Sequence, residues 1–578
     1  MDWERLISTK RLGMEGIESA HKDDRSAFLR DYDRLIFSAP FRRLQNKTQV
    51  FPLPGSVFVH NRLTHSLEVS CVGRSLGNNV SRGIIQRHPE LANTNITEIG
   101  NIVSAACLAH DMGNPPFGHS GEKAISAYFT EGKGQFLFEQ FKKNPGQWTD
   151  IINFEGNANA FRLLAHQFIG RRKGGFAMTY STLASIVKYP YASILANGKH
   201  KFGFFESEAP IFAQIADELG IIRLSEPDQP LKYVRYPLVW LVEAADDICY
   251  LLMDLEDAHK LKLLSTEQTI SLMMDFLEPS ERDHAYSIIG MVTDVNEKVS
   301  YLRSKLVGIL VDECTQVFLE NEKAILDGTF SESLIKHISL TPREAYRKCA
   351  ELSVQKIYRS RDVLEVELAG FRIISTLLDL MVEAVLNPDR EYSKLLIGRV
   401  SSQYDINATD IYNRILAVLD YISGMTDVNE QVSYLRSKLV GILVEECTKV
   451  FLENEKAILD GTFSGSLIKH ISPTPREAYR NCAELSISKI YRSRDVLEVE
   501  LAGFRIISTL LDLMVEAVQN PEREYSKLLI DRVSSQYDIK APDIYNRLLA
   551  VLDYISGMTD VYALDIYRKI NGNSLPAV

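Results

Sequence analysis

The sequence predicts an all-α protein, and three observations support that prediction. Segments such as LVGILVDECTQVFLENEKAIL and LAGFRIISTLLDLMVEAVL place apolar residues three and four positions apart, which is the pattern of an amphipathic helix. Proline stands in connecting segments such as HISLTPRE and LNPDREYS, where helices start or stop. No part of the sequence sustains the alternation of apolar and polar residues that is typical of a half-buried strand. We therefore expect helices along the whole chain.

The composition is that of a globular protein with more than one domain. The chain has 578 residues, of which 45% are hydrophobic and 24% are charged. A net charge of -11 argues against non-specific coating of nucleic acid, although it leaves room for a local basic pocket. The sequence contains no run of about 18 apolar residues, so we expect no membrane span. The charged start MDWERLISTKRLG lacks an apolar signal core, and the cysteines show no CxxC spacing, so we expect a cytoplasmic protein with reduced thiols.

Three helices expected in the first half carry residues that could bind a metal ion. His65 lies in THSLEVSCVGRSLGNNV, and the pair His110 and Asp111 ends IVSAACLAHD, which MGNPP interrupts. Asp246 lies in LVWLVEAADDICYLLMDLEDA, a largely apolar helix in which carboxylates are costly unless they are paired or metal-bound. Each residue alone is weak evidence, because a single histidine on a helix is more often structural.

If these segments converge, the chain is a metal-dependent phosphohydrolase. Two imidazoles and two carboxylates suit Mn²⁺, Mg²⁺, Fe²⁺, Ni²⁺ or Zn²⁺, whereas the nitrogen ligands argue against Ca²⁺. Such an ion would polarise a phosphorus centre and orient or activate the attacking water.

The second half of the chain contains a tandem duplication. Residues 293–425 begin TDVNEKVSYLRSKLVGILVDEC, and residues 426–558 begin TDVNEQVSYLRSKLVGILVEEC, with 14 differences and no gap over the whole length. Units of 20–50 residues are usual for solenoids, so a repeat of 133 residues indicates a recent in-frame duplication instead. We expect a core in residues 1–292, then copy 1 (293–425), copy 2 (426–558) and a tail in residues 559–578. Without one copy the chain would have 445 residues.

Three long segments resemble the deoxynucleoside triphosphate triphosphohydrolases, the dGTPase-like branch of the HD superfamily. They read FRRLQNKTQVFPLPGSVFVHNRLTHSLEVSCVGR, HDMGNPPFGHSGE and EAADDICYLLMDLEDA, and the resemblance covers roughly residues 1–290. The later segment ISGMTDVYALDIYRKI is similar too. The resemblance implies an HD-domain helical catalytic core that hydrolyses a dNTP, dGTP among others, to the deoxynucleoside and tripolyphosphate. Water would attack at the α-phosphorus, with Mn²⁺ or Mg²⁺ as the expected cofactor.

The resemblance assigns His65, His110, Asp111 and Asp246 as the metal ligands. Asp246 is chosen over Asp247 because the family pattern places a tyrosine four residues and an aspartate eight residues after the ligand. These positions are Tyr250 and Asp254, and the spacing puts all three on one helix face. In this interpretation Tyr250 stacks against the deoxyribose and Asp254 accepts a hydrogen bond from the 3′-hydroxyl.

The catalytic pair implied by the resemblance is His119 and Glu122 in GHSGE. His119 would be the catalytic imidazole, which suits proton transfer near neutral pH, and Glu122 would orient it or relay a proton. The alternative is that both residues form a polar cap at a helix start. Asn114 stands where some relatives carry a further histidine, which weakens the case for a second catalytic imidazole.

Further residues match positions that contact the substrate in the family. Gln49 and Val50 match positions that line the base and sugar, and Lys188 and Tyr189 match a phosphate-binding segment. Arg62, three residues before His65 on the same helix edge, is a further candidate phosphate contact. The segment KIYRSRD occurs once in each copy, and its Arg359 or Arg492 could reach the triphosphate, although a solvated helix face explains these charges equally well.

The expected partners are a dNTP substrate and other copies of the chain in a homo-oligomer, with no membrane. A nucleotide effector and a single-stranded nucleic acid stay open as further partners. Either copy of the duplication could pack on the core. Two other functions also remain: another HD-type phosphohydrolase, such as a nucleotidase or phosphodiesterase, or a non-catalytic nucleotide-binding or nucleic-acid-binding protein.

Overall fold

The fold is all-α, as the sequence predicts. The computed structural model describes residues 1–16, 25–47, 49, 60–196, 198–357, 361–425, 430–486, 494–534 and 536–571. Over these residues β-structure is limited to isolated bridges such as the one between Arg11 and Thr179. In the same part of the chain, no helix has the length and apolar character needed to cross a membrane.

The chain divides into two compact units. One unit comprises Met1–Ala285 with Val299–Ser437, and the other comprises Tyr286–Lys298 with Lys438–Val578. Most of copy 1 therefore belongs to the same unit as the core, and most of copy 2 belongs to the other. The four segments expected from the sequence, with boundaries after residues 292, 425 and 558, remain a prediction.

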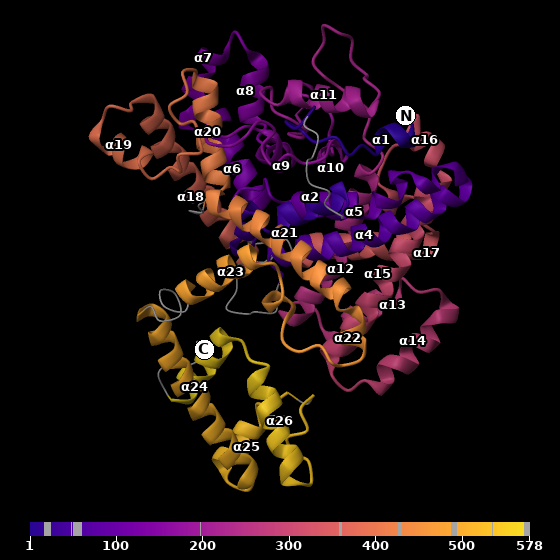
Figure 1. The fold of residues 1–578 in the computed structure, drawn as a ribbon, viewed down its shortest axis with the longest axis vertical. Helices are drawn as coiled ribbons and strands as arrows, with labels where there is room; N and C mark the ends of the chain where they lie inside the picture. Colours follow the sequence, from indigo (N-terminus) through magenta and orange to yellow (C-terminus); the bar gives the residue numbers. More distant parts are fainter. Residues whose placement is uncertain are drawn as a thin grey trace. The chain divides into compact units, whose positions relative to one another are not determined.

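The core is built from helices joined by loops and short 3₁₀ turns. Its helices are α1 (Trp3–Leu6), α2 (Ala27–Ile36), α3 (Ala39–Arg43), α4 (Arg62–Arg87), α5 (Ile99–Ala109), α6 (Gly118–Thr130), α7 (Phe138–Phe141), α8 (Pro145–Ile152), α9 (Gly156–Ala165), α10 (Tyr180–Ile186), α11 (Ala209–Leu219), α12 (Val239–Lys260), α13 (Thr266–Met274) and α14 (Pro279–Met291). Figure 1 shows α4, α5 and α12 near the middle of this set.

Helices α4, α5 and α12 form the centre of the core. Nearly every residue of α5 is buried, as its apolar sequence IGNIVSAACLA predicts. Helix α4 packs against it at very short range, because a Cβ atom on Gly77 would lie 2.7 Å from the Cα of Gly100. The start of α4 is held by a capping box in which Asn61 and Thr64 bind each other's backbone amides. These contacts fix the helices that carry the candidate ligands.

The two copies have matching helices. Copy 1 contains α15 (Val295–Glu320), α16 (Glu322–Leu326), α17 (Leu340–Leu352), α18 (Arg361–Leu386), α19 (Glu391–Ile397) and α20 (Ile411–Ser423). Copy 2 contains α21 (Glu430–Glu453), α22 (Glu455–Leu459), α23 (Pro473–Ser486), α24 (Arg494–Gln519), α25 (Glu524–Asp531) and α26 (Ile544–Ser556), and α27 (Asp560–Ile570) follows.

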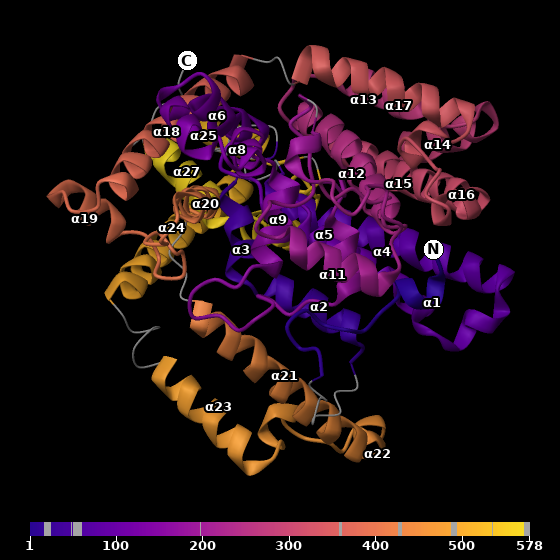
Figure 2. The same ribbon diagram turned by 90° about the horizontal axis from the view of Figure 1, so that it is seen from above.

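Copy 1 packs on the core, which answers a question that the sequence leaves open. Helices α18 and α20 lie beside α6 and α8 in both views (Figures 1 and 2), and their apolar residues share one buried cluster with the core. The buried guanidinium of Arg162 binds the carboxylate of Asp420 at 2.8 Å. The hydroxyl of Tyr412 donates to the carboxylate of Asp150. Polar anchors and apolar packing therefore hold copy 1 in place.

Copy 2 has an apolar cluster of its own with the tail. Leu510, Met514 and Val518 of α24 pack with Val551 and Ile555 of α26. Helix α27 completes this cluster through Ala563 and Ile566.

His60, two residues before α4, joins this helix to α12. His60 Nδ1 lies 2.8 Å from a carboxylate oxygen of Asp257, and its Nε2 lies 3.1 Å from Glu68. The backbone amide of His60 also donates to Asp257 at 2.9 Å. Although burial opposes protonation, these two carboxylates raise the pKa of His60 to about 10, from an ordinary 6.5. The folded protein therefore holds a proton here that the unfolded chain loses above pH 6.5.

We predict that this histidine makes stability depend on pH. Its contribution is fully present below pH 6.5 and is lost as the pH rises toward 10, because only the folded state keeps the proton in that window. Urea unfolding at pH 6.5 and 9.5 should show a smaller loss of stability in His60→Gln than in the wild type. His284→Gln, which changes an exposed histidine, should behave as the wild type. Equal losses in all three proteins would refute the role of His60.

Candidate metal centre and active site

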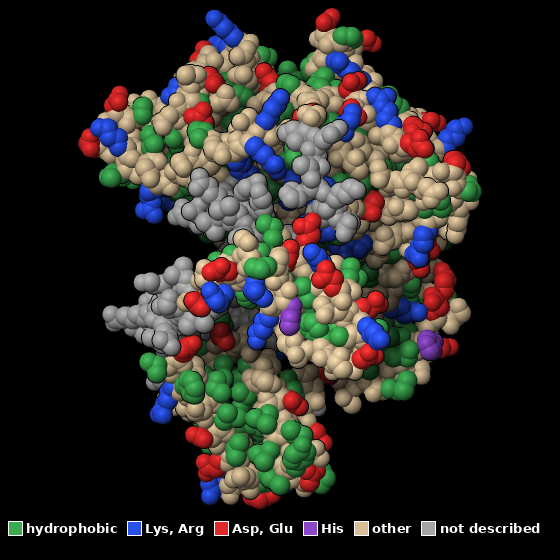
Figure 3. All heavy atoms as spheres, viewed as in Figure 1, with side chains coloured by type: hydrophobic (Ala, Val, Ile, Leu, Met, Phe, Trp, Pro, Cys, Tyr) green, Lys and Arg blue, Asp and Glu red, His purple; other side chains and the backbone are tan. Residues whose placement is uncertain are grey.

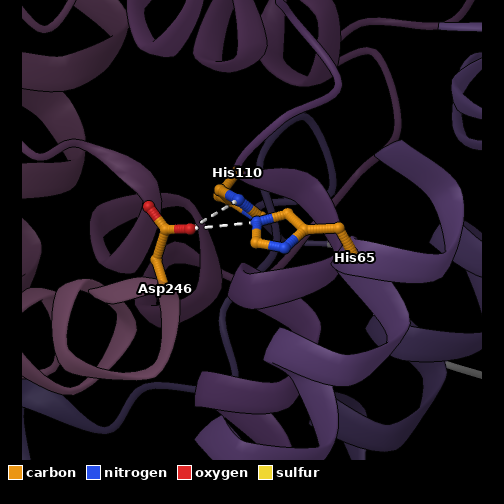
Figure 4. Close-up of side chains that lie close together, drawn as sticks. All are labelled: His65, His110 and Asp246. Atoms are coloured by element: carbon orange, nitrogen blue, oxygen red, sulfur yellow. Dashed lines mark hydrogen bonds and ion pairs between the residues drawn. The ribbon is translucent and has the colours of Figure 1, made fainter. Parts of the chain in front are cut away.

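Three of the four predicted metal ligands lie together. His65 comes from α4, His110 caps the C-terminal end of α5, and Asp246 comes from α12 (Figure 4). One oxygen of Asp246 lies 3.1 Å from Nε2 of His65 and 3.5 Å from Nε2 of His110. One donor atom from each residue falls within 4.8 Å of the other two, as a shared cation requires.

The tautomer of His110 leaves a nitrogen directed at this cluster. Its Nδ1 lies 2.6 Å from the carbonyl oxygen of Cys107, which can only accept, so Nδ1 carries the proton. Its Nε2 is buried and has no hydrogen-bond partner among the described residues. Despite burial, the carboxylates of Asp111 and Asp246 raise the pKa of His110 to about 9. This is a position for positive charge, which a metal ion would fit.

The fourth predicted ligand, Asp111, lies beside the cluster and has other partners. One of its oxygens accepts from Arg62 Nη1 at 2.7 Å, and the other accepts from Asn114 Nδ2 at 2.5 Å. The second oxygen is 3.7 Å from His110 Nε2. Although burial opposes it, the Arg62 charge holds the pKa of Asp111 below its usual value. The assignment of Asp111 as a ligand stays a prediction.

The loop between α5 and α6 has an unusual backbone beside Arg62. Phe117 has φ +66° and Gly118 has φ +54°, both in the left-handed region. A Cβ atom on Gly118 would lie 2.3 Å from Nη2 of Arg62, so a larger residue at this position would force the guanidinium to shift. The segment PPFGH is therefore a loop in which the nearby Arg62 side chain favours glycine at position 118.

The predicted catalytic residues lie at the start of α6. His119 is exposed at the surface, yet desolvation by the surrounding protein and the charges of Lys201 and Arg62 lower its pKa. Glu122 accepts a hydrogen bond from the backbone amide of Gly156 at 2.8 Å, and its other oxygen lies 3.8 Å from Lys201 Nζ. Burial raises the pKa of Glu122, although Lys201 opposes this.

The predicted sugar-reading residues follow Asp246 along α12. The ring of Tyr250 stands edge-on to the ring of His65, with 6.4 Å between centroids. Asp254 is buried one turn further on. The neighbouring Asp247 is absent from the ligand cluster, and its backbone carbonyl accepts from the hydroxyl of Tyr346 in copy 1 at 3.2 Å. Asp246, which the family pattern selects, is therefore the one of the two adjacent carboxylates that lies in the cluster, and its role as a metal ligand stays a prediction.

The predicted phosphate-binding residues Lys188 and Tyr189 are half-buried and contact other side chains of the core. Lys188 forms an ion pair with Glu243 at 3.1 Å and lies over the ring of Tyr189. Burial opposes protonation, but the carboxylate of Glu243 raises the pKa of Lys188, so the amine is charged. Oε1 of Gln49 is buried and has no hydrogen-bond partner within the described part of the chain. The remaining candidates, Val50, Arg359 and Arg492, lie outside the described residues.

Two lysines near the site were not predicted. Lys47 Nζ donates to the carbonyl of Asn114 at 2.6 Å and to the carbonyl of Ser423 at 2.7 Å, which joins the loop after α5 to the end of α20. Lys201 binds Glu155 at 2.9 Å beside Glu122. Both are single lysines in loop segments, and no spacing or motif in the sequence distinguishes them from solvated lysines.

Comparison with known proteins identifies the family. The HD domain model matches residues 62–156. A deoxyguanosinetriphosphate triphosphohydrolase-like protein of Synechocystis sp. is 38% identical over 453 residues, which cover 76% of this chain and all of the relative. The chain belongs to the deoxyguanosinetriphosphate triphosphohydrolase-like family. A like-named protein of Listeria monocytogenes is 33% identical over 75% of this chain and 99% of its own length. The deoxyguanosinetriphosphate triphosphohydrolase of Yersinia enterocolitica is 29% identical over 75% of this chain and 98% of its own length.

The extent of these matches bears on the duplication. The phosphohydrolase-associated domain model matches residues 470–569, which is most of copy 2 with part of the tail. The Synechocystis family member is covered completely by 453 aligned residues, close to the 445 residues of this chain without one copy. This relative therefore has the length of a single-copy protein.

We predict that Gly118→Ala destabilises the protein. An alanine at φ +54° costs about 1–2 kcal/mol, and its methyl group would also displace the Arg62 guanidinium from Asp111. Thermal or urea unfolding should show a loss of about 1–3 kcal/mol. The matched control is Gly308→Ala in α15, where a Cβ atom meets nothing within 4 Å and a helical alanine should stabilise by up to about 1 kcal/mol. Equal stability of Gly118→Ala and the wild type would contradict the strain argument.

Proposed function

We propose that the chain hydrolyses deoxynucleoside triphosphates, dGTP among them, to the deoxynucleoside and tripolyphosphate. Water attacks the α-phosphorus in this reaction. The observation that carries the proposal is the cluster of His65, His110 and Asp246, with the α6 residues His119 and Glu122 close enough for the charge of Asp111 to shift their pKa values. The names of the family members supply the substrate class.

The residues that would hold a divalent cation are His65, His110 and Asp246, with Asp111 as the fourth candidate. The buried Nε2 of His110, which lies 3.5 Å from a carboxylate oxygen of Asp246, and the mixed nitrogen and oxygen donors fit such an ion. When bound, Mn²⁺ or Mg²⁺ would supply Lewis-acid polarisation of a phosphate oxygen and lower the pKa of a water. Release of Asp111 from Arg62 would then free the guanidinium for a phosphate oxygen.

Proton transfer is assigned to His119. Because its pKa is lowered, the imidazole is neutral at physiological pH and can accept a proton from the attacking water. The resulting imidazolium can return this proton to the 5′-oxygen of the leaving deoxynucleoside. Glu122, whose pKa is raised by burial, is placed one helical turn later and can relay or balance that charge.

Cationic residues near the cluster suit a triphosphate. Arg62, Lys188 and Lys201 are half-buried or buried, and each is already paired with a carboxylate that a phosphate could replace. Tyr250 stands beside His65, where a deoxyribose ring could lie against it. A 2′-hydroxyl would crowd this ring, which gives a reason for a preference for deoxynucleotides. Homo-oligomerisation, a nucleotide effector, a single-stranded nucleic-acid partner and a cytoplasmic location also remain proposals.

The products of dGTP hydrolysis test the proposed reaction. With Mn²⁺ or Mg²⁺, we expect deoxyguanosine and tripolyphosphate in equal amounts, resolved by ion-exchange chromatography. His110→Ala removes one donor of the cluster and should reduce both products and Mn²⁺ binding by at least about 100-fold. Release of orthophosphate or of a nucleoside monophosphate would instead indicate another HD-type phosphohydrolase. No turnover of any dNTP would favour a nucleotide-binding protein.

The second test concerns His119. His119→Ala should lower kcat by about 10²–10⁴-fold, the usual contribution of general acid–base catalysis, because no other group would carry the proton. Mn²⁺ affinity, measured by calorimetry, should stay unchanged because His119 is not a member of the ligand cluster. His284→Ala changes an exposed histidine and serves as the matched control. Unchanged turnover in His119→Ala would remove the proposed role.

A further inference from the structure

The same apolar face is buried in copy 1 and exposed in copy 2. Tyr412 and Leu419 of copy 1 are at most 4% exposed and lie in the cluster that copy 1 shares with the core. Their counterparts 133 residues later are Tyr545 at 67% and Leu552 at 51%. Figure 3 shows apolar side chains gathered over the segment that Figure 1 labels α24 to α26. Copy 2 therefore presents a face that its twin covers with the core.

Copy 1 shows what kind of partner this face fits. Its apolar residues pack against aromatic residues of α7 and α8, including Phe141 and Trp148, in a single buried cluster. Three polar anchors surround the cluster, and each joins copy 1 to the core: Asp420 with Arg162, Tyr412 with Asp150, and Asp379 with Lys133. The core surface that receives copy 1 is defined here by Phe117, Lys133, Phe141, Asp150 and Arg162, and is called the receiving surface.

The anchors are unchanged in copy 2. Asp553, Tyr545 and Asp512 stand at the positions of Asp420, Tyr412 and Asp379. None of the 14 differences between the copies alters an anchor, and within α20 the copies differ at one position, where Ile415 becomes Leu548. Such an exchange of similar volume is among the best tolerated in a core.

Glycine at the closest contact is unchanged too. Gly370 of α18 lies so near the loop before α6 that a Cβ atom would be 2.5 Å from the Cγ of Phe117. Its counterpart Gly503 meets nothing within 4 Å. Copy 2 thus has glycine at a position where a side chain would clash only if the copy were packed on the receiving surface.

We propose that copy 2 is an alternative occupant of the receiving surface of its own chain and exchanges there with copy 1. The buried guanidinium of Arg162 needs a carboxylate, and Asp553 provides the same group as Asp420. Covalent attachment keeps copy 2 at a high effective concentration near the core, which favours exchange within one chain over exchange between chains. The match of residues 470–569 to the phosphohydrolase-associated domain agrees with copy 2 being a competent partner of the core.

Paired variants test this exchange in the full chain. Asp420→Ala with Tyr412→Ala removes two anchors of copy 1, and Asp553→Ala with Tyr545→Ala removes the same two of copy 2. Hydrogen exchange of the α6 and α8 amides reports whether the receiving surface is covered. We expect each double variant to exchange within about 10-fold of the wild type, and the fourfold variant to exchange at least about 100-fold faster, because only then does neither copy bind well. The proposal would be overturned if the copy 1 double variant and the fourfold variant exchanged at the same rate, whether that rate is slow as in the wild type or fast.

A milder series guards against loss of folding. Gly370→Ala, Gly503→Ala and the combination keep good helix formers in α18 and α24 and change only the closest approach to Phe117. Faster exchange of α6 in the combination alone supports the proposal, and equally fast exchange in Gly370→Ala overturns it. All measurements are repeated at tenfold lower protein concentration. Protection of the copy 1 double variant that disappears on dilution would assign the occupant to a neighbouring chain and overturn exchange within one chain.

Discussion

The carboxylate of Asp246, held between the imidazoles of His65 and His110, is the contact on which the rest of the structure depends. The three residues come from three different helices, so the contact exists only if α4, α5 and α12 pack in one arrangement. Two contacts outside the cluster support that arrangement of helices. Gly77 and Gly100 bring α4 and α5 together, and His60 joins the start of α4 to Asp257 of α12. A cation would therefore bind to a cluster that the core has already assembled.

The C-terminal region takes part in shaping the site. Lys47 binds the carbonyls of Asn114 and Ser423, and burial, together with Arg62 and Arg43, lowers its pKa to about 7. A neutral amine still has two N–H groups, which is the number these two carbonyls need. Copy 1 thus contacts the loop that carries Phe117 and Asn114 and so supports the residues beside the candidate ligands. This explains physically why a helical region distant in sequence belongs to the same compact unit as the core.

The sequence predicted the fold class because helical periodicity is a local pattern, whereas the family resemblance, and not a local pattern, assigned the residues of the cluster. The choice of Asp246 over Asp247 came from the family pattern, which places a tyrosine four residues and an aspartate eight residues after the ligand, and this spacing puts the three residues on one helix face. The partners of Asp111 were beyond sequence reasoning, because Arg62 begins α4 and meets Asp111 only when α4 and α5 pack together. Lys47 and Lys201 were missed because isolated loop lysines carry no pattern. The choice between copies was undecidable in principle, as copies with 14 differences have almost the same packing preferences.

The most direct test of the central claim is anomalous diffraction from crystals of the protein grown with Mn²⁺. We expect one strong anomalous peak among the side chains of His65, His110 and Asp246, with Asp111 turned from Arg62 toward it. His110→Ala crystals should lack that peak. A wild-type structure with Mn²⁺ bound elsewhere, or with no peak at this cluster at saturating Mn²⁺, would contradict the claim that these three residues form the metal centre.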